Sequence, residues 1–372
     1  MVRPFSAATP SMTRHELACG ALAATKVVVV TQRQAVDETG SAGLISQLIP
    51  FLDGGCPTQM SMISGRTFWR LCSVFLISIA ATSASAEPKL FESRQVTPSG
   101  EYTGGIEGPA ADLDGNLFVV NFGRPGTIGK LAAAGSHSEK FIDLPQGSVG
   151  NAIRFDSHGT MLVADYKKHT IFAIRKGAKE PDVVFHSDLM SQPNDITAAR
   201  DGTIYASDPN WKGRNGRIWR IWTAADGRVQ GEAMIAPRAM GTTNGIDLSP
   251  DEKTLYVGES NNGQLWAYGI SGNELTSPRL LKTFEADSID GLRTDVDGKL
   301  LIARIRKGVI AVLKPDATLQ QDVVLLGLEP TNLAFGGLDG RTVFVTQRQG
   351  RFIEAFRTDR EGREHCIQRA GC

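Results

Sequence analysis

Short apolar segments alternate with turn residues along most of the chain, and they recur in a fixed pattern. Each recurrence has a polar residue, an apolar strand, a turn and a second apolar strand. The six copies are EGPAADLDGNLFVV (107–120), NAIRFDSHGTMLVA (151–164), NDITAARDGTIYAS (194–207), NGIDLSPDEKTLYVG (244–258), DGLRTDVDGKLLIA (290–303) and NLAFGGLDGRTVFV (332–345). Their turn positions recur every 42 to 51 residues. Such spacing of short strands predicts an all-β chain built from internal repeats.

Each copy predicts a four-stranded unit. A third apolar segment follows in every copy, at 127–131, 170–174, 217–222, 264–268, 309–313 and 352–356, and a fourth follows in five, as at 139–144, 181–186 and 322–327. Four strands per repeat at this period are typical of a β-propeller blade. The sixth copy lacks its fourth strand, which the upstream segment KLFESRQV (89–96) can supply, closing the ring without an exposed edge. We therefore predict a six-bladed β-propeller over residues 87–358. A β-sandwich explains the many strands but not the period or the split last blade.

The residues before this domain favour an export sequence over the alternative of a buried helix. Arg66 and Arg70 precede an apolar run at 71–81, and Ala84-Ser85-Ala86 follows. A basic region, a short apolar region and an A-x-A site predict a signal peptide over 60–86, cut after Ala86. The run is shorter than the ~20 residues that span a bilayer. We expect a periplasmic or extracellular protein with no stable membrane span after cleavage. Residues 1–59 have no interpretation, and a start at Met60 or Met62 would remove them.

Composition narrows the range of partners. The chain has 40 Lys and Arg residues against 40 Asp and Glu residues and contains no basic run, which argues against nucleic acid or an anionic membrane as partner. Only Cys366 and Cys372 would remain after cleavage. Both lie in a C-terminal tail, 359–372, that we expect to lie outside the propeller, and they could form a small disulfide in an oxidising compartment. The oligomeric state is not indicated.

Every repeat begins with an oxygen-bearing side chain, and these six residues are Glu107, Asn151, Asn194, Asn244, Asp290 and Asn332. The first strand of a blade lines the central channel, so matched residues should converge near one end of it. Capping of local turns is an alternative role for any single Asn, and it stays open for Asn151 and Asn332. Capping does not explain the two carboxylates, which in a channel need a cation, hydrogen bonds or raised pKa values.

No Lys, Arg or His occupies an equivalent position, so the simplest source of positive charge is a metal ion. Carboxylate and carboxamide oxygens suit a hard cation, and Ca²⁺ best tolerates a mixed, irregular oxygen shell. Mg²⁺ and Mn²⁺ are alternatives if waters complete the coordination. Zn²⁺ is a weaker alternative because it normally takes His or Cys ligands.

At these residues the chain resembles the family of senescence marker protein (regucalcin), gluconolactonase and related lactonases. More remotely, it is similar to the diisopropyl-fluorophosphatase and paraoxonase propellers. The similarity covers about residues 100–358 and is carried by EGP at Glu107, PNDITAARDGTIYASDP (193–209), TNGIDLSPDEKTLYVGES (243–260), IDGLRTDVDG (289–298) and PTNLAFGGLDGRTVFVT (330–346). The resemblance implies a six-bladed propeller that hydrolyses lactones and other esters. It also implies a divalent ion, commonly calcium, held by Glu107, Asn194, Asn244 and Asp290.

The chain departs from this family at one position. Sugar-lactone members similar to it often carry Arg two residues before the third-blade Asn, where this chain has Gln192, which leaves the acyl group of the substrate open. We expect substrate contacts from Gln192, Asn194, Asn151 and Asn332. The loop NWKGRNG (210–216) should add Trp211 at the channel rim, with a solvated hairpin tip as the alternative. His137, His158, His169 and His186 fall on loops, turns or outer strands, so no His dyad is expected.

The combined prediction is a metal-dependent hydrolase of small lactones or related esters. The ion would polarise the carbonyl, with Asp290 as general base or, alternatively, as nucleophile. Glu107 and Asn244 would hold the ion, and Asn194 would bind ion or substrate. Two alternatives remain. One is a non-catalytic exported propeller that binds a ligand or protein partner and keeps a structural calcium. The other is a metal-free enzyme similar to strictosidine synthase that uses a carboxylate.

Overall fold

The structure is a computed structural model that describes residues 30–36, 42–48, 89–286 and 288–372. Its chain divides into two compact units, Met1–Thr82 and Ser83–Cys372. In the first unit, β1 (Val30–Val36) and β2 (Ala42–Leu48) form a two-stranded antiparallel sheet. The predicted signal peptide at 60–86 lies outside the described residues, so export stays a prediction. Across the described ranges, we find no helix with the length and apolar character needed to cross a membrane.

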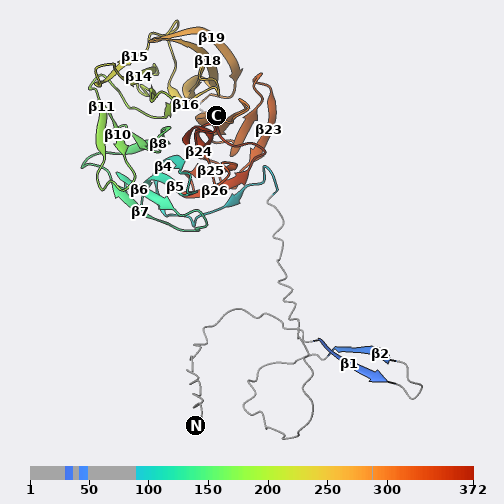
Figure 1. Cartoon of the computed structure of the whole chain (residues 1–372). Coiled ribbons are helices and arrows are strands. Elements are labelled where there is room, and N and C mark those ends of the chain that lie inside the picture. The colour runs from blue at the N-terminus through green and yellow to red at the C-terminus, as the bar shows by residue number, and fades with distance from the viewer. Residues whose placement is uncertain (1–29, 37–41, 49–88, 287) are drawn as a thin grey trace, which may run out of the picture. The chain divides into compact units, whose positions relative to one another are not determined.

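The second unit consists of six four-stranded antiparallel sheets that follow one another around a central axis, with the C terminus near the centre of the ring (Figure 1). Blade 1 contains β4 (Tyr102–Ala111), β5 (Leu117–Phe122), β6 (Thr127–Leu131) and β7 (Ser138–Asp143). Blade 2 contains β8 (Gly150–Phe155), β9 (Met161–Asp165), β10 (Thr170–Ile174) and β11 (Asp182–His186). Blade 3 contains β12 (Ile196–Ala198), β13 (Ile204–Asp208), β14 (Arg217–Thr223) and β15 (Val229–Ala233).

Blade 4 contains β16 (Thr243–Leu248), β17 (Thr254–Glu259), β18 (Gln264–Ser271) and β19 (Glu274–Thr283), with the 3-10 helix η1 (Ser260–Asn262) after β17. Blade 5 contains β20 (Ile289–Thr294), β21 (Leu300–Arg304), β22 (Val309–Leu313) and β23 (Leu319–Val324). Blade 6 contains β24 (Pro330–Gly336), β25 (Thr342–Gln347), β26 (Phe352–Arg357) and β3 (Arg94–Gln95). The short helix α1 (Arg363–Gln368) follows. The predicted six-bladed propeller is confirmed.

The last blade is completed by the N-terminal strand, as the missing fourth strand predicted. Arg94 and Gln95 pair with Ala355 and Glu354 of β26. The Ser93 hydroxyl also donates a hydrogen bond of 2.8 Å to the Glu354 carboxylate. This pairing covers an edge of β26 that would otherwise expose unpaired backbone groups.

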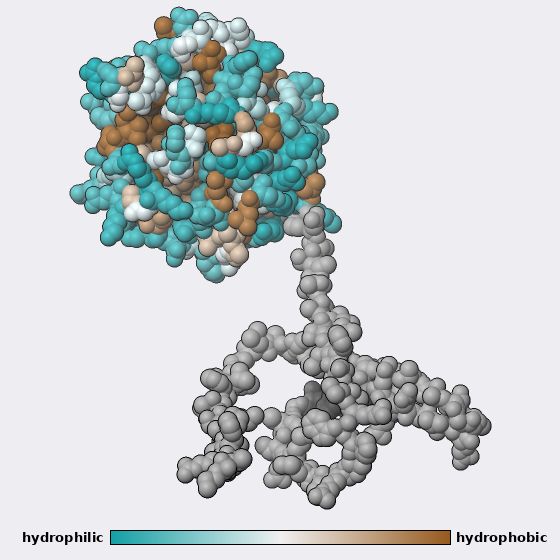
Figure 2. Space-filling view, viewed as in Figure 1, coloured by the Kyte–Doolittle hydropathy of each residue, from teal (hydrophilic) through white to brown (hydrophobic). Residues whose placement is uncertain are grey.

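The hydrophobic core is divided among the junctions between adjacent blades. Among the described residues, six apolar clusters each join two neighbouring sheets. On β9, Met161 and Val163 pack toward blade 1, whereas Leu162 and Ala164 pack toward blade 3. Successive side chains of a strand point to opposite faces, so a strand buried on both faces reads as a continuous apolar run. The outer surface seen in Figure 2 is mainly hydrophilic, with apolar residues in smaller groups.

The innermost strands carry an irregularity where the polar ring was predicted. The antiparallel register shifts between Glu107 and Ala110, Gly150 and Ala152, Thr243 and Ile246, Ile289 and Leu292, and Pro330 and Asn332. An extra residue in one strand bends it and re-aims a side chain. These shifts free Asn151, Asn244 and Asp290 from regular pairing at the channel.

Two glycines let neighbouring innermost strands approach closely at this level. A Cβ on Gly245 would lie 2.4 Å from the Asp290 carbonyl oxygen, and one on Gly291 would lie 2.1 Å from the Asn332 side-chain oxygen. Any larger residue would therefore push the strands apart where the polar residues converge.

Candidate active site at the mouth of the central channel

The polar ends of the innermost strands surround a cavity of about 450 Å³. Seven of the eight residues predicted for the site line it: Glu107, Asn151, Gln192, Asn194, Trp211, Asn244 and Asp290. They come from blades 1 to 5, and Thr331 and Arg348 add blade 6 to the wall. Five of the six matched repeat positions therefore converge on one cavity, and Asn332 is the exception.

Glu107 lies on β4 and is partly exposed to the cavity. Its Oε2 accepts a hydrogen bond of 2.9 Å from the backbone N–H of Gly108. Burial raises the pKa of Glu107 to about 8, although this hydrogen bond and another from the Asn332 side chain oppose the rise. The carboxylate form is thus destabilised in the protein without a cation beside it.

Asp290 lies on β20 of blade 5, which blade 6 separates from blade 1 in the ring. Asn244 donates a hydrogen bond of 2.9 Å from Nδ2 to Asp290 Oδ1, and a second of 3.1 Å to the Ser260 hydroxyl. Burial raises the pKa of Asp290 well above its ordinary value, and the charge of Glu107 raises it further. The two carboxylates are therefore close enough to repel each other.

The donor atoms around these carboxylates fit a hard cation. Asn244 Oδ1 is buried and has no hydrogen-bond partner among the described residues, while its amide nitrogen is fully used. Asn194 adds a second carboxamide to the cavity wall. Nowhere in the described ranges do three or more His, Cys, Asp or Glu residues gather as a metal site. The four predicted ligands offer two carboxylates and two carboxamides, an all-oxygen set of the kind that suits Ca²⁺ more than Zn²⁺.

Arg348 is a cavity residue that the sequence reasoning missed. It follows β25 and forms a two-pronged ion pair with Glu329, with nitrogen–oxygen distances of 3.0 and 3.2 Å. The bond to Glu329 raises the pKa of Arg348, and the charges of Asp290 and Glu107 add to the effect. The cavity therefore holds a cationic side chain within electrostatic reach of both acids. Because Arg348 lies outside the repeat position that carries the ring, no pattern pointed to it.

Asn332 does not lie where a substrate contact was predicted. Its side chain is 1% exposed, and it is buried beneath the cavity instead of lining it. Its Oδ1 accepts hydrogen bonds of 2.8 Å from Arg293 and 2.9 Å from the Leu333 backbone N–H. Asn332 thus supports Glu107 from behind and does not line the cavity wall.

The other predicted positions need no such correction. Asn151 lines the cavity and donates a long hydrogen bond of 3.4 Å to the Asn194 carbonyl, linking blades 2 and 3. Trp211 is 46% exposed and forms part of the rim, as expected for its loop. No histidine of the described residues is among those that line this cavity.

Comparison with known proteins places these features in a family. The model of the SMP-30/gluconolactonase/LRE-like region matches residues 107–349. A gluconolactonase from Zymomonas mobilis subsp. mobilis is 25% identical over 227 residues, covering 53% of this chain and 60% of that protein. A 6-deoxy-6-sulfogluconolactonase from Pseudomonas putida is 30% identical over 154 residues, covering 37% of this chain and 53% of that protein. The chain thus spans between half and two thirds of the length of these relatives.

Solved structures share the fold. A putative gluconolactonase superposes with a TM-score of 0.61 at 20% identity, covering 73% of this chain and 93% of that chain. A calcium-binding protein, regucalcin, from Agrobacterium tumefaciens superposes with a TM-score of 0.58 at 20% identity, covering 72% and 97%. Since the family model spans the ring from Glu107 past Arg348, this chain belongs to the SMP-30/gluconolactonase/LRE-like family.

Proposed function

We propose that this protein is a metal-dependent hydrolase of small lactones or related esters. The observation that carries the proposal is the pair Glu107 and Asp290, which come from different blades and line one cavity. Burial raises the pKa of both carboxyl groups, and the charge of Glu107 raises the pKa of Asp290 further. Buried like charges of this kind are a feature of functional sites. The gluconolactonase and sulfogluconolactonase relatives support lactones as the substrate class.

Four residues would hold the ion in this proposal: Glu107, Asn194, Asn244 and Asp290. Ca²⁺ is the first choice because the unpaired Asn244 oxygen and the two carboxylates give it oxygen ligands without His or Cys. When bound, the cation would polarise the lactone carbonyl and stabilise the negative charge that develops on its oxygen.

Asp290 is the residue we assign to proton transfer. Its carboxylate accepts a proton from the attacking water while the new carbon–oxygen bond forms. The ring carbon–oxygen bond then breaks, and the same proton passes to the leaving alkoxide, giving a hydroxy acid and restoring Asp290. The Asn244 N–H, 2.9 Å from Oδ1, fixes the orientation of the carboxylate during these steps. In the alternative, Asp290 attacks the carbonyl carbon and the ring carbon–oxygen bond breaks, giving an anhydride and an alkoxide that takes a proton from water. Hydrolysis then regenerates Asp290, and attack of water on the Asp290 carbonyl carbon in ¹⁸O-water would label the side chain in a single turnover.

The remaining wall residues suit binding of a small polar molecule. Arg348 can form charge-assisted hydrogen bonds with the carboxylate of the ring-opened product. Trp211 offers an apolar face at the rim, and Gln192 and Asn151 offer hydrogen bonds to hydroxyl groups.

Hydrolysis of γ-, δ- and sugar lactones, with calcium present and then removed by a chelator, tests the proposal. We expect turnover that depends on calcium and is lost in Asp290→Ala, whereas the surface variant Asp143→Ala keeps it. Near-normal hydrolysis by a folded Asp290→Ala protein would refute the assignment of Asp290. Calcium binding without turnover of any lactone would indicate the non-catalytic propeller, and turnover with no bound metal would indicate the metal-free mechanism.

A further inference from the structure

The C-terminal segment is part of the propeller and does not lie outside it as the sequence suggested. Residues 361–372, here called the C-terminal hub, comprise α1 and the disulfide between Cys366 and Cys372. The side chains of Arg363, His365, Cys366 and Ile367 are all buried. Its contacts are with the far ends of the innermost strands, away from the strand starts that line the cavity.

The hub forms hydrogen bonds with every blade. The bonds run from Gln368 to the Ala111 carbonyl (3.1 Å, blade 1), from the Phe155 N–H to Glu364 (3.0 Å, blade 2), from Arg363 to the Ala198 carbonyl (3.1 Å, blade 3), from Arg363 to Glu252 (2.6 Å, blade 4), from the Val296 N–H to the Glu361 carbonyl (3.1 Å, blade 5) and from the Gly362 N–H to the Gly340 carbonyl (3.1 Å, blade 6). The apolar clusters of the described residues join each blade to its two neighbours, whereas the hub contacts all six blades.

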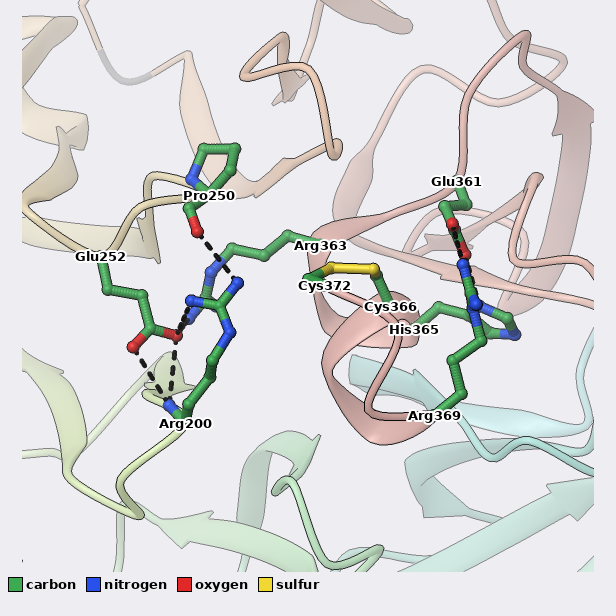
Figure 3. The surroundings of a disulfide bond; sticks show 9 residues. All are labelled: Arg200, Pro250, Glu252, Glu361, Arg363, His365, Cys366, Arg369 and Cys372. Carbon is green, nitrogen blue, oxygen red and sulfur yellow. Dashed lines mark hydrogen bonds and ion pairs between the residues drawn. A yellow bond between two sulfur atoms is a disulfide. The ribbon is translucent and has the colours of Figure 1, made fainter.

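Figure 3 shows the two sides of this segment around the disulfide. On one side Arg363 extends toward Glu252, which also accepts hydrogen bonds from the Arg200 backbone N–H. On the other side Glu361 pairs with His365 and Arg369. Arg363 is 2% exposed, whereas the Arg369 side chain is 46% exposed. The hub therefore turns one arginine into the molecule and one toward solvent.

A buried ionic network continues from the hub toward the cavity. Glu364 lies 3.5 Å from Arg154, and Arg154 and Arg293 each lie 2.9 Å from one oxygen of Asp195. Arg293 also donates the 2.8 Å hydrogen bond to Asn332, the residue behind Glu107. Arg154, Arg293 and Arg363 are the three largest fully buried side chains among the described residues. Removing one partner from such a network leaves an uncompensated charge, so its members constrain one another strongly.

The cavity depends on the arrangement of blades more than on any one blade. Its four proposed ion ligands come from blades 1, 3, 4 and 5. A site of this kind needs its groups held to within roughly 0.5 Å, which requires a rigid support around them. We propose that the C-terminal hub is a positioning element for the cavity, fixing the blades and the ionic network so that Glu107 and Asp290 face each other. The catalytic part of this inference rests on the proposed function.

Two hub variants and one matched control test the inference. Glu364→Gln keeps the size of the side chain and an oxygen for the Phe155 N–H but removes the charge facing Arg154. Arg363→Met removes the buried guanidinium. The control, Arg369→Met, makes the same replacement at the exposed end of the segment. Calorimetric Ca²⁺ titration gives the dissociation constant, steady-state lactone hydrolysis gives kcat and KM, and urea unfolding gives stability.

We expect each hub variant to weaken Ca²⁺ binding about tenfold, as loss of supporting groups around a metal commonly does. We also expect kcat to fall with KM near the wild-type value, the control to stay within about twofold in both, and Arg363→Lys to recover part of the loss. If Arg363→Met does not fold, the results for Glu364→Gln decide whether the hub has a positioning role. A Glu364→Gln protein that binds Ca²⁺ and turns over like the control would overturn the positioning role.

The two proposals can fail separately. If the wild type binds Ca²⁺ without hydrolysing lactones, the proposed function fails and the Ca²⁺ affinities still decide the role of the hub. If the wild type hydrolyses lactones without Ca²⁺, the kcat values of the hub variants decide the role of the hub. If it does neither, both proposals are overturned.

Discussion

Replacing Glu107 with Gln should stabilise the protein when no metal is bound. Burial raises the pKa of Glu107 to about 8, from an ordinary value of 4.5. Between these pH values the unfolded chain loses the proton while the folded chain keeps it, so rising pH favours unfolding. A pKa difference of one corresponds to ~1.4 kcal/mol, which gives an upper limit of roughly 5 kcal/mol above pH 8. Because Glu107 borders a cavity that water can enter, we expect roughly 2 kcal/mol after screening.

Urea unfolding of chelator-treated protein at pH 5 and pH 8.5 measures this effect. Glu107→Gln keeps an oxygen for the Gly108 N–H and should exceed the wild type in stability at pH 8.5, with a much smaller difference at pH 5. Adding Ca²⁺ should reverse the order, because only the wild type then gains a charged ligand. The exposed variant Glu139→Gln serves as control and should match the wild type at both pH values. A metal-free Glu107→Gln protein that is no more stable than wild type at pH 8.5 would refute the reasoning.

Three further predictions follow from the same structure. The increase in melting temperature caused by Ca²⁺ should grow as pH rises from 5 to 8, because binding must displace protons from Glu107 and Asp290, whose pKa values are both raised; an increase that is independent of pH would contradict this ion site. Arg348→Met should weaken inhibition by the hydroxy acid product about tenfold, the effect of losing a charge-assisted pair, while the exposed variant Arg351→Met leaves inhibition unchanged. Deleting residues 87–96 should lower the melting temperature and promote aggregation, because the edge of β26 is then uncovered; light scattering on heating would reveal it, and an unchanged transition would show that β3 is dispensable.

The fold was predictable because the repeat leaves several independent marks on the sequence. The apolar segments 127–131, 170–174 and 309–313 coincide with β6, β10 and β22. The turn of each repeat served as a reference point for aligning the blades. Glu107 and Asp290 stand at the same position relative to their turns, so they were expected at the same level of the channel although they are far apart in the chain. Repetition thus supplied information on distant contacts that a single strand could not.

The buried arginines and the C-terminal helix were missed because no repeated sequence pattern indicates them. Arg154 and Arg293 lie three residues after Asn151 and Asp290, a spacing that regular strand alternation places on the opposite face. The register shifts in β8 and β20 bring both positions to the channel, and a bulge of this kind has no dependable sequence pattern. Helix α1 has only six residues, too few to show a helical period, and it begins after Gly362 without a side-chain cap. The sequence therefore contains no signal for this helix.

The pairing of β3 with β26 also bears on how the molecule folds. The hydrogen-bonded pair Ser93 and Glu354 is separated by 261 residues. Individual blades can form from local hairpins, but their ring stays open until almost the whole polypeptide has been synthesised. Contacts this distant in sequence are slow to form, so we expect the final joining of the two chain ends to limit the folding rate. A nascent chain of this protein therefore holds an open ring, with the edge of β26 unpaired, until β3 docks on it.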